Sequence, residues 1–140
     1  MALTYSQART MLKTINGNNS GNPIYIGLSR TTPGRSGNSV DEPPAEAGYR
    51  RVRLASTAMT DPSHGSTNNQ DTIYFAEATG DWGVCTYFCL FNSQSANKDS
   101  SGNDTTLLAY GALPNSVHPT GNETSGTVPL IRAGNLVMTL

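Results

Sequence analysis

The sequence has little charge and no long apolar run. Only 14% of its 140 residues are charged, and the formal net charge is −1. Nucleic-acid-binding proteins usually carry a basic excess, because contacts with phosphates supply much of their affinity. A membrane-spanning helix needs roughly 20 apolar residues in a row. We therefore expect neither a nucleic-acid partner nor a membrane partner.

Cysteine and histidine are also scarce, with two residues of each: Cys85, Cys89, His64 and His118. Two cysteines do not suggest a disulfide framework, and the N-terminal sequence lacks the apolar core of a signal peptide, so we expect synthesis in a reducing cytoplasm. On a strand, Cys85 and Cys89 would lie about 13 Å apart, too far to form a disulfide or to share one zinc ion. We expect two packed thiols, no metal and no cofactor.

Turn-forming residues, by contrast, are abundant, above all Gly, Ser, Thr and Asn. Short stretches of alternating character lie between them, at 23–29, 49–56, 72–76, 84–91 and 107–113, with two more within 128–140 around a kink at Ala133-Gly134. Several short strands separated by turns predict an all-β fold, here a β-sandwich, of which a jelly roll is one form. Residues 31–48, 61–71 and 93–104 are expected to be polar loops.

The N-terminus departs from this pattern and predicts a short helix. Thr4 to Gln7 matches a capping box, and Tyr5, Ala8, Leu12 and Ile15 recur on one helical face. Asn16-Gly17 would end the helix. We predict two parts: an N-terminal helix or arm and loop at 1–22, and the β-sandwich domain at 23–140. The helix either anchors the chain to a partner or sister subunit, or packs on its own sandwich.

The stretch GDWGVCTYFCLF combines a tight turn with the most apolar strand. Alternate side chains of 84–91 point to opposite faces, and both sets are largely apolar. Such a strand is expected at the centre of a sheet, covered on both sides. Trp82, in the turn before it, is expected to pack its indole ring rather than to bind a ligand.

Arg50, Arg51 and Arg53 form the one charge cluster. Three interpretations stay open, in falling order of preference: pairing with Asp41, Glu42 and Glu46, contact with an acidic neighbouring subunit, and contact with nucleic acid. The candidate subunit or partner contacts are Tyr5, Leu12, Tyr49, Arg50, Arg51 and Arg53.

Catalytic patterns are not evident in the sequence. His64 and His118 stand in expected loops without a nucleophile motif, and the acidic residues of 41–46 have no fixed separation. We predict no enzymatic activity and no catalytic residues.

Five motifs follow one another along residues 24–140: YIGLSRTTPG, GYRRVRL, IYFAEATGDWGVCTYFCLFN, LLAYGAL and IRAGNLVMTL. In this order they resemble a family of small tailed-bacteriophage virion proteins. The positions that match the family pattern are Tyr25, Leu28, Ser29, Pro33, Gly48, Tyr49, Arg51, Ile73, Phe75, Ala78, Trp82, Gly83, Phe91, Leu108, Gly111, Leu113, Gly134 and Leu136.

The resemblance implies a structural protein of the virion surface, assembled in the bacterial host cytoplasm and bound to other virion proteins of the capsid or tail. Association with a tail fibre or tail tip is the first expectation, and capsid decoration is the alternative. A carbohydrate-binding module for host-surface glycans is a second alternative, with Tyr5, Tyr25, Tyr49 and Tyr110 as its aromatic residues. A short, edge-rich β chain also favours a homo-oligomer, most simply a trimer.

Overall fold

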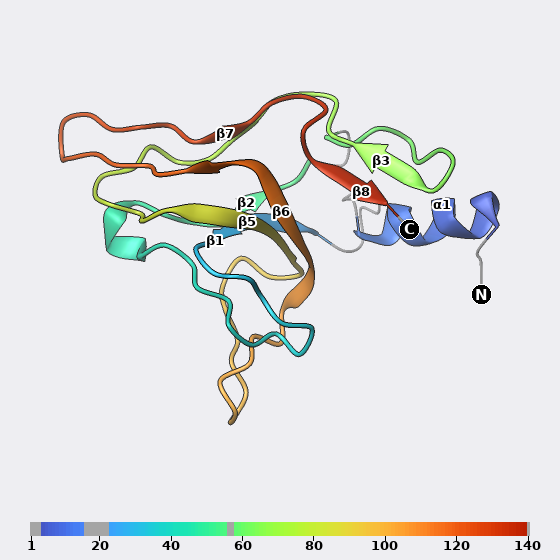
Figure 1. The fold of residues 1–140 in the computed structure, drawn as a ribbon, viewed down its shortest axis with the longest axis horizontal. Coiled ribbons are helices and arrows are strands. Elements are labelled where there is room, and N and C mark those ends of the chain that lie inside the picture. The colour runs from blue at the N-terminus through green and yellow to red at the C-terminus, as the bar shows by residue number, and fades with distance from the viewer. Residues whose placement is uncertain (1–3, 16–22, 56–57, 140) are drawn as a thin grey trace. The chain divides into compact units, whose positions relative to one another are not determined.

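The computed structural model describes residues 4–15, 23–55 and 58–139 (Figure 1). Antiparallel sheets and one short N-terminal helix make up the regular structure, so the prediction of an all-β fold with an N-terminal helix is confirmed. No helix in the described residues combines the length and apolarity that crossing a bilayer requires. The elements are α1 (Tyr5–Ile15), β1 (Tyr25–Ser29), η1 (Ala45–Ala47), β2 (Val52–Arg53), β3 (Ser66–Asn68), β4 (Ile73–Tyr74), β5 (Cys85–Phe91), β6 (Leu107–Val117), β7 (Leu130–Ile131) and β8 (Val137–Thr139).

The chain forms two compact units. Unit 1 combines the described part of Met1–Ile24 with Leu54–Ile73 and Leu130–Leu140, and unit 2 combines Tyr25–Arg53 with Tyr74–Pro129. Each unit therefore gathers segments that are far apart in the sequence. The sequence-based division into 1–22 and 23–140 stays a prediction.

Unit 2 contains a four-stranded antiparallel sheet in the order β2-β1-β5-β6. β5 lies between β1 and β6, which confirms the central position predicted for 84–91. Phe88 and Leu90 are buried, as are Cys85, Cys89 and Phe91 on the alternate positions. Because burying one large apolar side chain stabilises a fold by about 1.5–3 kcal/mol, β5 supplies much of the core of this unit.

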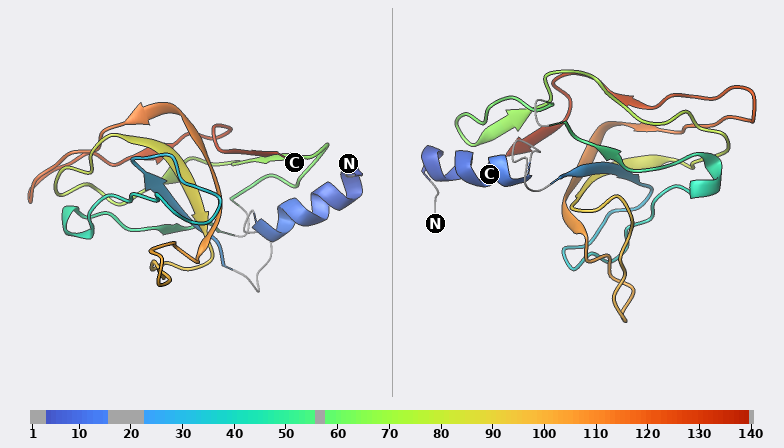
Figure 2. Two further views of the ribbon diagram at one scale, coloured as in Figure 1. Left: turned by 60° about the horizontal axis from the view of Figure 1, so that its bottom comes forward. Right: turned by 180° about the vertical axis from the view of Figure 1, so that it is seen from behind.

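Two long loops of unit 2, at 31–48 and 93–104, lie side by side beneath the sheet (Figures 1 and 2). Their backbones are joined directly, since Asp104 N donates to Gly37 O over 2.9 Å. Gly37 has φ of 83°, and a Cβ there would lie 2.3 Å from the carbonyl oxygen of Asp104. Only glycine fits this left-handed position at such a close approach.

Strand lengths differ from the predictions in two places. The strand expected at 49–56 is limited to Val52–Arg53, which pair with Ile26 and Tyr25 of β1. The strand expected at 107–113 continues to Val117, which pairs with Cys85.

The helix and the C-terminal strand belong to unit 1. Gln7 N donates to Thr4 Oγ1 over 3.2 Å, as the capping motif predicts, and Ala8 and Leu12 are buried on one face. Tyr5, predicted on the same face, is exposed. The predicted helix end at Asn16-Gly17, with the rest of 16–22, lies outside the described residues, as does the side chain of Ile15.

The polar loop expected at 61–71 contains a strand, β3, which pairs antiparallel with β8. Asn69, directly after β3, is buried. Its Nδ2 donates to the carbonyl oxygens of Asp71 and Arg132 over 2.9 Å each, and its Oδ1 accepts from Leu136 N over 2.9 Å. One amide side chain thus holds the turn at 132–136 against β3, which fixes the start of β8.

Replacing Asn69 with Ala is expected to lower the free energy of unfolding by about 2–3 kcal/mol, because several buried backbone groups would lose their partner. Asn135→Ala, in the same turn but exposed, is the matched control and should change stability by less than about 0.5 kcal/mol. Urea unfolding of both variants measures the difference, and equal midpoints for the two would contradict the role given to Asn69.

Candidate functional site

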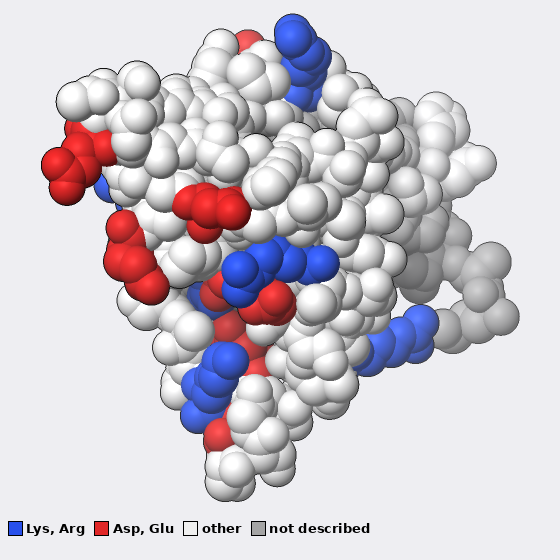
Figure 3. Space-filling model, turned by 60° about the vertical axis from the view of Figure 1, so that its left-hand side comes forward, with Lys and Arg blue, Asp and Glu red and all other residues white. Residues whose placement is uncertain are grey.

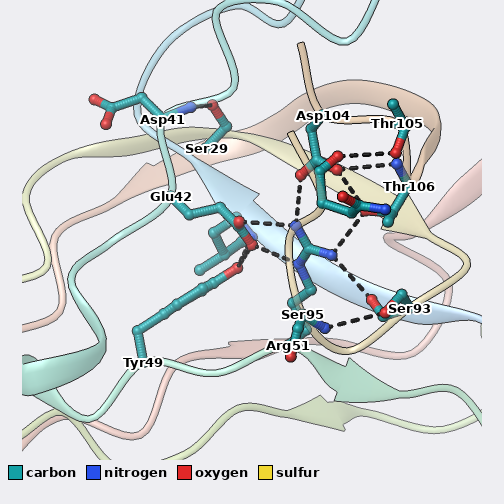
Figure 4. Close-up of polar contacts among 12 residues, drawn as sticks. Ser29, Asp41, Glu42, Tyr49, Arg51, Ser93, Ser95, Asp104, Thr105 and Thr106 are labelled. Atoms are coloured by element: carbon teal, nitrogen blue, oxygen red, sulfur yellow. Dashed lines mark hydrogen bonds and ion pairs between the residues drawn. The ribbon is translucent and has the colours of Figure 1, made fainter. Parts of the chain in front are cut away.

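Arg51 is the centre of a buried polar network in unit 2 (Figure 4). Its side chain is only 3% exposed, yet every N–H of the guanidinium group has an acceptor. Nε and Nη2 donate to the two carboxylate oxygens of Glu42 over 2.9 Å each. Nη2 also donates to Asp104 Oδ2 over 2.8 Å. Nη1 donates to Ser93 O over 2.9 Å and to Thr106 Oγ1 over 3.0 Å.

The partners of Arg51 are themselves fixed. Asp104 Oδ1 accepts from Thr106 N over 2.9 Å and from Thr106 Oγ1 over 2.6 Å. Glu42 Oε1 accepts from the Tyr49 hydroxyl over 2.6 Å, and that hydroxyl accepts from Leu28 N over 3.1 Å. The network therefore reaches from the loop at 93–106 to the backbone of β1.

An aromatic ring covers one face of the guanidinium group, since its carbon lies 3.4 Å from the centre of the Phe91 ring. A desolvated cation over an aromatic face is attracted by the ring quadrupole. Phe91 ends β5, so this contact joins the network to the apolar core.

The charges of the network reinforce one another. Burial alone would lower the pKa of Arg51, but its hydrogen bonds with Glu42 and Asp104 and their negative charges raise that pKa. Burial alone would raise the pKa of Asp104, but hydrogen bonds from Thr106 and the charge of Arg51 lower it. Burial, followed by the charge of Glu42, raises the pKa of Tyr49, which keeps its hydroxyl protonated as a donor.

The structure separates the residues predicted as partner contacts. Arg51 and Tyr49 lie together in the network and are buried, whereas Arg50 and Arg53 are exposed. In unit 1, Leu12 is buried and Tyr5 is exposed, with its ring centre 4.8 Å from that of His64. The side chains of Tyr5, Arg50 and Arg53 are exposed and therefore accessible to another molecule. Their contact with a partner stays a prediction.

The predicted pairing of the arginines with the acidic loop is confirmed for Arg51 and Glu42. Asp41 turns away from Arg51 (Figure 4) and pairs with Arg30, whose Nη2 lies 2.7 Å from Asp41 Oδ1. This hydrogen bond raises the pKa of Arg30. Sequence reasoning missed Asp104, the second carboxylate on Arg51, although the Asp-Thr-Thr step before β6 is typical of a turn in which Asp caps the backbone.

A shallow hollow of ≈ 330 Å³ lies beside the network. On the face seen in Figure 3, acidic and basic side chains lie next to one another in a mixed cluster. The oxygens of Glu42 and the N–H groups of Arg51 are already engaged in the network. The residues that line the hollow are Glu42, Pro43, Ala45, Tyr49, Arg50, Arg51, Gln94, Ser95 and Ala96.

Trp82 is fully buried in unit 2, which confirms the packing predicted for it. Its Nε1 donates to Ala47 O over 2.8 Å, and its ring packs edge-on against Tyr49 at 5.3 Å between centres. The indole therefore ties η1 to the turn before β5. Because Tyr49 is shared, the aromatic pair and the ionic network form one continuous structure.

The cysteines are free and buried, as predicted. Burial raises the pKa of Cys85 to about 11 and that of Cys89 to about 12. His118 lies at the surface, where its Nε2 is 2.7 Å from Asp81 Oδ1. Within the described ranges, no group of three or more His, Cys, Asp and Glu residues is arranged to hold a metal ion.

Arg51→Met is expected to lower the free energy of unfolding by about 3–5 kcal/mol, because it leaves Glu42 and Asp104 without their buried counter-ion. Arg53→Met removes an exposed arginine from β2, and its free energy of unfolding should stay close to that of the wild type. Chemical unfolding of both variants makes the comparison, and a stable Arg51→Met protein would show that the network contributes little.

Acid should weaken the network through Asp104. Because folding lowers its pKa, Asp104 adds stability above the pKa of an unfolded aspartate, about 4, and this contribution is lost as the pH falls through the folded value. Asp104→Asn should therefore be less stable than the wild type at neutral pH and show a smaller loss of stability below pH of about 4. The exposed Asp71→Asn serves as the control, and thermal unfolding between acid and neutral pH measures all three proteins. An unchanged acid dependence in Asp104→Asn would argue against this role.

Comparison with known proteins gives one family. The family model described as podophage GP4 fiber I protein gp80 matches residues 2–139. No curated protein matches the chain. The match spans both compact units and includes the segments that build the Arg51 network. The chain thus belongs to the podophage GP4 fiber I protein gp80 family, a family of fibre proteins of tailed phages, and is a component of the virion.

Proposed function

We propose that the chain is a non-catalytic structural protein of a tail fibre or tail tip, exposed on the virion surface. It is assembled in the host cytoplasm, binds other virion proteins and associates with copies of itself. The family match over residues 2–139 is the observation that carries this proposal. Capsid decoration is the alternative position on the particle.

The arrangement of unit 2 supports a structural role. A protein on the outside of a particle has to keep long surface loops in one conformation, although ordering each residue costs about 1–2 kcal/mol. Here a buried arginine and two carboxylates connect the loops at 31–48 and 93–106 to the sheet. The buried charged groups of unit 2 thus stabilise the conformation of these two loops.

A carbohydrate-binding module for host-surface glycans is the second alternative. Of the tyrosines considered from the sequence, Tyr49 is buried, Tyr25 and Tyr110 are half-buried and Tyr5 is exposed. Stacking on a sugar needs an accessible ring, so the buried Tyr49 is excluded as a sugar-binding residue. A glycan array with the purified chain tests this activity separately from its position on the particle.

Immunogold electron microscopy of purified particles, with an antibody raised against the chain, is expected to label the tail. Particles from a phage that lacks the gene for this chain are the control and should carry no label. Label spread over the head would establish capsid decoration instead. Particles without label, from a phage that expresses the chain, would overturn the assignment to the virion surface.

A further inference from the structure

The hollow beside the Arg51 network carries polar side chains that the fold itself does not use. Arg50 and Gln94 line this hollow of ≈ 330 Å³, and both are exposed. Among the residues that the structure describes, neither side chain has a hydrogen-bond or ion-pair partner. The hydroxyl of Ser95, which lies beside Arg51 in Figure 4, is unpaired in the same sense. A guanidinium, an amide and a hydroxyl group are therefore available here to a ligand.

Glu42 adds a hydrogen-bond acceptor to the same hollow. Its Oε1 accepts from the Tyr49 hydroxyl and from Arg51 Nε, whereas its Oε2 accepts from Arg51 Nη2 alone. A carboxylate oxygen has two lone pairs, so Oε2 retains one acceptor position. The Glu42 side chain is 21% exposed, compared with 3% for Arg51. Glu42 is thus the member of the network that a ligand can reach.

The network holds these groups in place before any ligand arrives. Two hydrogen bonds from Arg51 fix the carboxylate of Glu42. Arg51 Nη1 also donates to the carbonyl oxygen of Ser93, the residue before Gln94. Both loops that line the hollow are therefore attached to one buried side chain. A ligand that binds to a preorganised site loses less affinity to the ordering of loops.

The charges around the hollow favour a neutral ligand. Arg50 and Arg51 carry two positive charges, and Glu42 and Asp104, the two partners of Arg51, carry two negative ones. An anion drawn to Arg50 would also meet the carboxylate of Glu42, and a cation drawn to Glu42 would meet Arg50. The remaining accessible lining is apolar, because Ala45 and Ala96 are exposed at the hollow.

We propose that this hollow binds a neutral saccharide unit. Each sugar hydroxyl both donates and accepts, so neighbouring hydroxyls of one ring can donate to Glu42 and accept from Arg50 and Gln94. The C–H face of the ring packs on Ala45 and Ala96. The volume lies at the lower end of the range for small-molecule sites, about 300–1,000 Å³. The inference rests on the proposed function, because it assigns glycan binding, the second alternative there, to one site.

The test titrates the full chain with single sugars and follows its backbone amides by NMR. Glucose, galactose, rhamnose and N-acetylglucosamine are the neutral probes, glucuronate is the anionic probe, and a capped dipeptide is the peptide probe. At least one neutral sugar is expected to shift the amides of 42–51 and 94–96 saturably. The expected dissociation constant is on the order of 1 mM, since a single sugar offers few atoms for contact.

Arg50→Ala combined with Gln94→Ala should raise this dissociation constant at least about tenfold, because two hydrogen-bonding side chains are removed. Arg35→Ala combined with Asn135→Ala is the matched control. It removes an exposed arginine and an exposed amide that lie outside the hollow, so the dissociation constant should not change. Circular dichroism establishes that each variant is folded, and Gln94→Ala alone replaces the double variant if that protein does not fold.

A chain on which no neutral sugar causes saturable shifts, or on which the shifts lie outside the hollow, overturns the proposal. Tighter binding of glucuronate or of the capped dipeptide does the same, because it assigns the hollow to an anion or to a peptide. Equal dissociation constants for the wild type and the Arg50–Gln94 double variant also contradict the site. Immunogold labelling of the virion does not depend on sugar binding, so a failure here is distinguishable from a failure of the proposed function.

Discussion

A guanidinium ion taken out of water needs an acceptor for each of its N–H groups, and in unit 2 these acceptors come from distant parts of the chain. Arg51 obtains them from Glu42, Ser93, Asp104 and Thr106. Each acceptor must stand within about 3 Å and in the right direction. Two long loops that have little regular structure are thereby held in one position relative to the sheet.

The aromatic residues extend this constraint into the apolar core. Tyr49 belongs to both structures, since its hydroxyl serves Glu42 and its ring packs against Trp82. The absence of a side chain on Gly27 makes room for this, because a Cβ there would lie 2.4 Å from the Tyr49 hydroxyl. The position of η1, held by Trp82 through Ala47, then follows from the same set of contacts. Tyr49 thus connects the polar network of unit 2 to its apolar core.

The sequence predicts the strands whose signal is local. The two apolar faces of 84–91 predicted the central strand β5, and the place of Trp82 in the turn before this strand predicted its packing. β3 has no such signal, because Ser66, Thr67 and Asn68 are polar and the strand exists through its pairing with β8. β2 is shorter than its local pattern predicts, because only Val52 and Arg53 pair with β1.

In the candidate site too, the sequence predicts only the contact between residues that are close in the chain. Glu42 is nine positions from Arg51, and the pairing could be inferred from their proximity in the sequence. Asp104 is 53 positions away, and only the folded chain brings it to the same guanidinium group. The family resemblance, which depends on the order of several motifs, indicated the virion fibre class without either contact. The family of this chain can therefore be inferred from the order of its motifs, whereas the contacts of Arg51 require the folded structure.

The thiols of β5 have a consequence for the covalent durability of the protein. Oxidants attack the ionised form of cysteine, and with pKa values of about 11 and about 12 only about one thiol in ten thousand, or fewer, is ionised at neutral pH. Both sulfur atoms are also sealed from solvent in the sheet. In the folded chain, Cys85 and Cys89 are therefore protected from oxidation and from forming cross-links.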